Sequence, residues 1–99
     1  MNNTCRYEVE LHARGNPDFG EPHDLGLLPV WREVPDYSWA SQVCRDWLHE
    51  HDYGAGNWAG GRVRTKGDGR IVARVSFNGR VWEGDRCVYD PSQPLTEAT

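Results

Sequence analysis

The sequence contains no long hydrophobic run. Only 37% of its 99 residues are hydrophobic, and no stretch approaches the roughly 20 consecutive apolar residues that span a bilayer. The first residues, among them Asn2 and Asn3, also lack the apolar core of a secretory signal. We therefore expect no membrane association and a cytoplasmic location.

Cysteine is scarce, and its spacing is uninformative. The three cysteines, Cys5, Cys44 and Cys87, are an odd number with no short interval between any two. This argues against a disulfide framework and against a C-x-x-C zinc or redox motif. A reducing compartment, the cytosol, fits this pattern.

Recognisable catalytic motifs are missing as well. No serine stands in a G-x-S-x-G elbow, and the glycine loop 54–61 follows a predicted helix instead of opening one, which disfavours phosphate binding. Asp46, His49 and Glu50 share a predicted helix face but are too few for a structural zinc site. We predict no enzyme, no cofactor and no metal. A small enzyme of unknown reaction stays an alternative, which would need Cys44 beside a histidine.

Two elements stand out in what is present. Residues 6–12 alternate strictly between polar and apolar side chains, which predicts a half-buried strand. Asp36 or Ser38 can cap a helix that runs to about Tyr53, with Gly54 at its C-cap. The apolar stripe of this helix comprises Ala40, Val43, Cys44, Trp47, Leu48 and His51, and Ser41 is expected on its polar side.

The C-terminal part predicts a three-stranded meander over residues 62–83. A Gly67–Gly69 loop with Gly69 left-handed pairs Val63 with Ala73 and Thr65 with Ile71, and Asn78-Gly79 predicts a two-residue turn. This register places Trp82 on the core face. Residues 30–34 can add an edge strand, and residues 87–89 can prolong the last strand past a bulge at Gly84.

These elements predict an α+β fold. We expect a single domain over residues 1–90, in which a four-stranded, mainly antiparallel sheet (β-loop-α-β-β-β) packs one helix on one face. Residues 15–35 are expected to form a long irregular loop, and residues 91–99 a disordered tail.

Charge is distributed unevenly along the chain. Residues 1–60 hold ten acidic and four basic residues, whereas residues 61–99 hold five acidic and seven basic ones, so the net charge of −4 is the remainder of two opposed parts. The predicted register directs several bases to the outer face of the sheet: Arg62, Arg64, Lys66, Arg70 and Arg74. Glu83 opposite Arg74, and Glu8 and Glu10 on the first strand, are expected to neutralise part of this face, which carries no predicted aromatic for base stacking.

Acidic residues crowd the end of the predicted helix. Asp46, Glu50 and Asp52 stand where the helix dipole disfavours negative charge, and Asp46 and Glu50 repel each other at i, i+4. Side chains that cost stability are candidates for a functional role. We predict a partner-binding surface that also includes Tyr53 and the loop acids Asp18, Glu21 and Asp24. Scattered solubilising acids are an equally valid interpretation.

Three segments resemble small proteins of bacterial mobile elements and prophages: A-S-Q-V-C-R-D-W-L (40–48), G-A-G-N-W-A-G-G-R-V (54–63) and V-A-R-V-S-F-N-G-R-V-W (72–82). The size, acidity and single α/β domain are also similar to those of anti-CRISPR proteins. The resemblance implies a non-enzymatic inhibitor in the cytosol of a host bacterium, which binds a CRISPR effector complex and blocks DNA engagement or nuclease recruitment.

We therefore expect a non-enzymatic inhibitor or adaptor whose acids engage a basic surface of a host protein or ribonucleoprotein complex. The alternative from another class is a nucleic-acid-binding module that uses Arg62, Arg64, Lys66 and Arg74. The acidic net charge disfavours direct nucleic-acid binding, and the sequence does not predict an oligomeric state.

Overall fold

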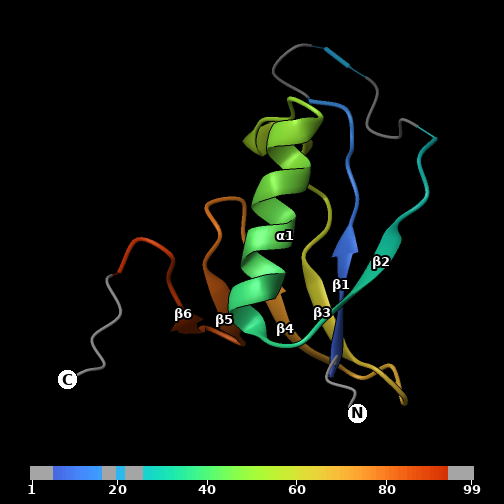
Figure 1. The fold of residues 1–99 in the computed structure, drawn as a ribbon. Coiled ribbons are helices and arrows are strands. Elements are labelled where there is room, and N and C mark those ends of the chain that lie inside the picture. Colours follow the sequence, from blue (N-terminus) through green and yellow to red (C-terminus); the bar gives the residue numbers. More distant parts are fainter. Residues whose placement is uncertain (1–5, 17–19, 22–25, 94–99) are drawn as a thin grey trace.

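A computed structural model describes residues 6–16, 20–21 and 26–93. The chain forms two layers, with one α-helix packed against one face of a six-stranded antiparallel sheet (Figure 1). The strand order is β2-β1-β3-β4-β5-β6. In chain order the elements are β1 (Tyr7–Leu11), β2 (Val30–Val34), α1 (Tyr37–Glu50), the short 3-10 helix η2 (Ala55–Asn57), β3 (Arg62–Thr65), β4 (Ile71–Val75), β5 (Val81–Glu83) and β6 (Arg86–Tyr89).

The core lies between α1 and the inner face of the sheet. Alternate residues of the strands point inward because successive strand side chains project to opposite faces. The helix contributes Ala40, Cys44 and Leu48 of the predicted stripe, whereas His51 is exposed. Ser41, expected on the polar side, is instead fully buried, and its hydroxyl donates to the Gly79 carbonyl at 2.7 Å. The buried cluster comprises Val9, Leu11, Val34, Ala40, Cys44, Val63, Ala73, Val75 and Val81.

The predicted α+β class with one helix on one face is confirmed, but the sheet has six strands instead of four. Residues 30–34 lie within the predicted irregular loop 15–35 and form the additional edge strand that the sequence allowed, β2, which pairs antiparallel with β1. The chain also does not bulge at Gly84. It turns there, with Gly84 at φ +62°, and returns as the separate edge strand β6. Residues 94–99 of the predicted tail lie outside the described residues.

The hairpin between β3 and β4 was predicted correctly at one end and wrongly at the other. Val63 pairs with Ala73 and Gly69 is left-handed (φ +72°), as expected. A bulge after Val63 then shifts the register by one residue. Ile71 therefore lies opposite Arg64 and not, as predicted, opposite Thr65. The connection therefore contains four residues, closed by the Thr65 amide that donates to the Arg70 carbonyl at 2.9 Å.

The prediction of a two-residue turn at Asn78-Gly79 is also wrong. The Ser76 amide donates to the Arg80 carbonyl at 2.9 Å and Gly79 has φ +89°, which is a three-residue loop with a left-handed glycine. The extra residue moves β5 by one position. Val81 becomes fully buried, and Trp82 lies opposite Arg74 on the outer face.

The same shift turns Glu83 to the helix side of the sheet. There it accepts a hydrogen bond from the Tyr37 hydroxyl at 2.8 Å, instead of pairing with Arg74. Burial, together with this carboxylate, raises the pKa of Tyr37 well above its usual value. The hydrogen bond in turn lowers the pKa of Glu83, with a smaller contribution from Arg86.

The glycine loop after α1 makes a tight return to the sheet. Gly61 has φ +103°, and a Cβ at this position would collide with the Val75 carbonyl oxygen. Trp58 covers the adjacent part of the core and donates from Nε1 to the same carbonyl at 3.0 Å. Over the described part of the chain, no helix is long and apolar enough to cross a membrane.

Candidate functional site

The C-terminal end of α1 is built around Asp52. The helix ends at Glu50, and the Tyr53 amide donates to the Leu48 carbonyl at 2.9 Å while the Asp52 amide donates to the His49 carbonyl at 3.1 Å. This pair of bonds is a Schellman motif, whose left-handed residue is usually glycine. Here Asp52 takes that conformation, with φ +59°, so the predicted extension to Tyr53 with Gly54 as cap is wrong.

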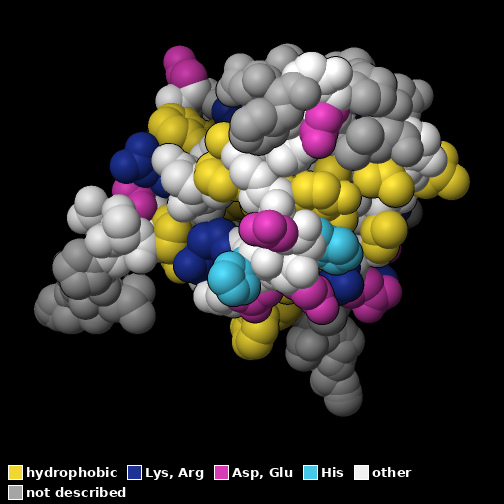
Figure 2. All heavy atoms as spheres, turned by 90° about the horizontal axis from the view of Figure 1, so that it is seen from above, with side chains coloured by type: hydrophobic (Ala, Val, Ile, Leu, Met, Phe, Trp, Pro, Cys, Tyr) yellow, Lys and Arg dark blue, Asp and Glu magenta, His cyan; other side chains and the backbone are white. Residues whose placement is uncertain are grey.

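The acidic side chains at the C-terminal end of α1 have no neutralising base in the described part of the chain. Among the described residues, Asp46, Glu50 and Asp52 are exposed and form no ion pair, although Asp46 accepts a hydrogen bond from Gln42 at 2.7 Å. The end of the molecule where α1 stops shows acidic and histidine side chains beside hydrophobic ones (Figure 2). This surface, defined by Asp46, Glu50 and Asp52, is called the acidic helix end below.

Of the three predicted loop acids, the structure describes Glu21 alone. Asp18 and Asp24 lie outside the described residues. The Glu21 carboxylate accepts a hydrogen bond from the Asn16 amide at 2.7 Å, so it already has a local structural partner.

A cluster of aromatic rings packs next to the acidic helix end. Trp47 contacts His51, Tyr53 and Trp58 with ring-centroid distances of 4.9, 5.5 and 6.2 Å, and His51 stacks on Tyr53 with an interplanar angle of 9°. Trp47, Tyr53 and Trp58 are half-buried, and His51 is exposed. The predicted partner-binding Tyr53 therefore belongs to a packed cluster that fixes the chain as it leaves α1.

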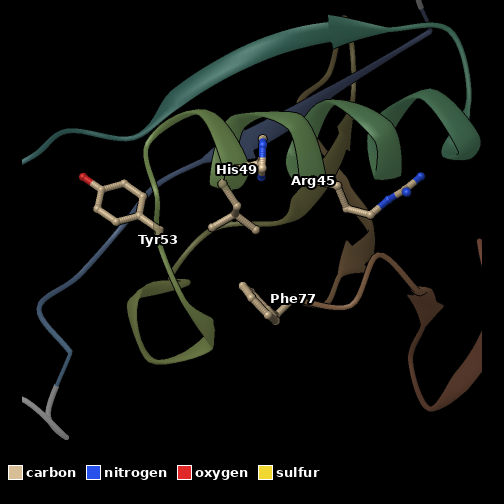
Figure 3. A pocket seen from close by; sticks show the side chains of 5 residues that line it. Arg45, His49, Tyr53 and Phe77 are labelled. Carbon is tan, nitrogen blue, oxygen red and sulfur yellow. The ribbon is translucent and has the colours of Figure 1, made fainter.

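A shallow cavity of about 220 Å³ lies next to this cluster, lined by Arg45, Leu48, His49, Tyr53 and Phe77. Phe77 projects toward α1 from the loop between β4 and β5, while the Arg45 guanidinium and the Tyr53 hydroxyl point outward on either side (Figure 3). Phe77 is 39% exposed. The fold thus places an exposed aromatic ring beside a helix whose acids are unneutralised.

The bases on the outer face of the sheet are largely neutralised, as predicted for Glu8 and Glu10. The Arg62 guanidinium binds the Glu10 carboxylate through two bonds of 2.8 and 2.9 Å, and Arg64 donates to Glu8 at 2.8 Å. Lys66 pairs with Glu33 of β2 at 2.9 Å. Three of the four residues proposed for nucleic-acid binding are therefore held in ion pairs within the chain.

The expectation that this face lacks aromatics is wrong. Trp31 lies on it, with the guanidinium carbons of Arg62 and Arg64 at 5.5 and 3.8 Å from its ring centroid. Because Arg64 covers this ring, little of it is left for stacking a base. Trp82 lies opposite Arg74 beside a cavity of about 250 Å³. Within the described ranges, Arg74 forms no ion pair.

The proposed catalytic thiol is buried. Cys44 is 1% exposed, and burial, with a smaller effect of the Glu10 charge, raises its pKa to about 12. A thiol held protonated and away from solvent is a poor nucleophile. Within residues 6–16, 20–21 and 26–93, no three His, Cys, Asp or Glu side chains are grouped so as to hold a metal ion.

Two aromatic residues that line one cavity, the exposed Trp39 and the half-buried Tyr89, were not identified from the sequence. Trp39 is 55% exposed on α1, and Tyr89 lies across a cavity from it on β6. The position of Trp39 beside the apolar helix stripe was a usable signal, because a tryptophan outside the stripe has no place in the core. The position of Tyr89 required knowledge of the sixth strand.

Comparison with known proteins adds no identification. No protein-family model, no curated protein and no solved structure matches this chain.

Proposed function

We propose that this protein is a non-enzymatic binding protein that engages a basic surface of a partner through its acidic helix end. One observation carries the proposal: ion pairing divides the charges of the described residues into two groups. Glu8, Glu10 and Glu33 on the sheet are all neutralised by bases of β3 or its following residue. The three acids of the helix end are not.

The placement of these acids costs stability in the free protein. A carboxylate near a helix C-terminus is disfavoured by about 0.3–1 kcal/mol, and Asp46 and Glu50 repel each other one turn apart. A partner that presents Lys or Arg side chains would relieve both effects on binding. Charge complementarity of this kind contributes mainly to the association rate and to specificity.

A host nucleic-acid-binding complex is the partner class that we propose. Such a complex displays Lys and Arg side chains that bind phosphates, and carboxylates on a small acidic protein can occupy the same positions. The resemblance of residues 40–48, 54–63 and 72–82 to mobile-element proteins supports an inhibitor of the anti-CRISPR type that acts in this way.

Affinity capture from a bacterial lysate that contains a CRISPR effector complex tests this proposal. The wild-type chain should retain a basic or nucleic-acid-binding complex, and the combined change Asp46→Lys, Glu50→Lys and Asp52→Asn should abolish that retention. The matched control is Asp85→Lys, which alters an exposed acid of the β5–β6 turn that forms no ion pair within the described residues. Equal capture by the wild type and the triple variant would contradict the proposed surface.

Nucleic-acid binding is a second candidate, favoured by one observation. Arg74 and Trp82 lie side by side on the outer face, next to a cavity, and supply a cation and an aromatic ring. If this function holds, the isolated protein should retain labelled single-stranded DNA or RNA with an affinity that falls steeply as salt increases, and Arg74→Ala should reduce that retention.

A further inference from the structure

A second cavity, of about 340 Å³, lies between the N-terminal half of α1 and the edge strand β6. It is lined by Ser38, Trp39, Gln42 and Tyr89, so an exposed and a half-buried aromatic residue from different elements border it. Trp39 is 55% exposed, more than any other tryptophan of the described chain. Tryptophan and tyrosine are the side chains that most often dominate binding energy at protein interfaces.

The two polar residues that line this cleft each donate a hydrogen bond to a neighbouring carboxylate. The Ser38 hydroxyl donates to Asp36 Oδ1 at 3.1 Å, and Gln42 Nε2 donates to Asp46 Oδ1 at 2.7 Å. Neither carboxylate forms an ion pair with any described base. Asp36 also caps the helix by accepting from the Trp39 amide at 2.9 Å, which offsets the positive end of the helix dipole beside the cleft.

Two bases are linked to the cleft, one by a hydrogen bond to Gln42 and one through the residue that follows Tyr89, and both have partners. Arg45 Nη2 donates to Gln42 Oε1 at 3.1 Å, and Arg80 pairs with Asp90, the residue after Tyr89, at 3.1 Å. The lining itself contains aromatic rings, an amide and a hydroxyl, but no cation. Aromatic faces with carboxylates behind them are complementary to a cationic side chain.

We infer that this cleft is the anchor site for an arginine side chain of the partner. A guanidinium is planar, so it can stack on the faces of Trp39 and Tyr89 while its N–H groups reach acceptors at the rim. Lysine offers a compact, more strongly hydrated charge and stacks less well. The inference rests on the proposed function, because it assumes a basic partner. It adds that this partner must present an arginine side chain to the cleft.

The cleft and the acidic helix end are continuous along one face of α1. Trp39, Gln42, Asp46 and Glu50 follow each other at intervals of three, four and four residues, which places them in one row. At 1.5 Å per residue the row is about 16 Å long, the reach of about five residues of an extended peptide. The partner segment should therefore carry an anchoring arginine and further bases about three to five residues away.

Binding of fluorescein-labelled hexapeptides to the full chain tests this inference. Hexaarginine should bind at least threefold tighter than hexalysine at low salt, and the neutral isostere hexacitrulline should show no binding. Trp39→Leu keeps apolar area but removes the π face, so it should bring the two cationic peptides within twofold of each other. Trp39 is exposed on the helix, and Tyr89→Leu provides a second variant if the first one fails to fold.

Two controls separate the cleft from the acidic helix end. Phe77→Leu changes an exposed aromatic that is not part of the cleft lining and should leave the arginine preference unchanged. Glu50→Gln should weaken both cationic peptides by the same factor, because it removes charge without altering the cleft.

The outcomes distinguish the two proposals. An arginine preference that survives Trp39→Leu, or hexacitrulline binding equal to that of hexaarginine, would overturn the arginine site. If capture from the lysate depends on the acids of the helix end but not on Trp39, the proposed function stands and the anchor site is wrong. If neither cationic peptide binds and capture is insensitive to the acids, both proposals are wrong.

Discussion

Replacement of Asp52 should stabilise the fold and weaken partner binding in the same variants. Asp52 occupies the left-handed position of a Schellman motif, with φ +59°, and carries a negative charge at the unfavourable end of the helix dipole. Asp52→Asn removes the charge and keeps a side chain that tolerates this conformation, so it should stabilise by about 0.5 kcal/mol. Asp52→Gly also removes the backbone cost and should stabilise by about 1–1.5 kcal/mol in total.

Thermal and urea unfolding measure these differences directly. For a domain of this size 1 kcal/mol corresponds to a Tm shift of about 4–8 °C, so the glycine variant should melt well above the wild type and the asparagine variant slightly above it. High salt should reduce the gain of Asp52→Asn, because it screens the dipole interaction. Asp85→Asn is the control, since Asp85 lies in the β5–β6 turn and not at a helix end.

The same variants report on function. Capture of a basic partner should fall with both replacements, because each removes a carboxylate of the acidic helix end. An unchanged or lower Tm for Asp52→Gly would refute the argument that this residue is held at a cost. A stabilised variant that captures the partner as well as the wild type would show that Asp52 does not belong to the binding surface.

Three further predictions concern the fold. The lowered pKa of Glu83 means that its contribution to stability is complete above about pH 4.5 and is lost as the pH falls through the lowered value, so Glu83→Gln should flatten the acid side of the stability profile in urea unfolding. Iodoacetamide should alkylate the exposed Cys87 in the native protein and Cys44 only after unfolding, as mass spectrometry of digests would show; rapid native labelling of Cys44 would contradict its burial. Gly61→Ala should lower the unfolding free energy by more than about 2 kcal/mol, because it adds a collision to an unfavourable φ, whereas Gly67→Ala, with φ +115° but open space, should cost clearly less in the same assay.

Local patterns predicted the elements that depend on near neighbours. The alternation of residues 6–12 indicated β1, and Asp36 followed by an apolar stripe indicated α1, whose cap accepts from the Trp39 amide within one turn. The acids at the end of the helix were visible for the same reason, because the dipole is a property of the helix itself. Their lack of ion pairs depends on the positions of the sheet bases and was not visible.

The errors lie where two arrangements have similar local energies. Asn78-Gly79 fits both a two-residue and a three-residue hairpin loop, and these differ by one position in β5, which exchanges the faces of Val81 and Trp82. The sequence therefore left Trp82 and Glu83 on the wrong sides of the sheet. Burial of Val81 in the core cluster, which joins distant segments of the chain, selects the register.

The sequence by itself determined the class of fold, the single helix, the opposed charges of the two parts of the chain and the buried thiol. Each of these follows from composition or from periodicity within one element. Tertiary structure decided which charges cancel, since Glu10 binds Arg62 across 52 positions of sequence. It also decided which aromatic residues line one cavity, since Tyr89 is placed opposite Trp39 by the sixth strand. These pairings depend on the order and register of strands, which are fixed by the packing of the whole chain and not by any segment alone.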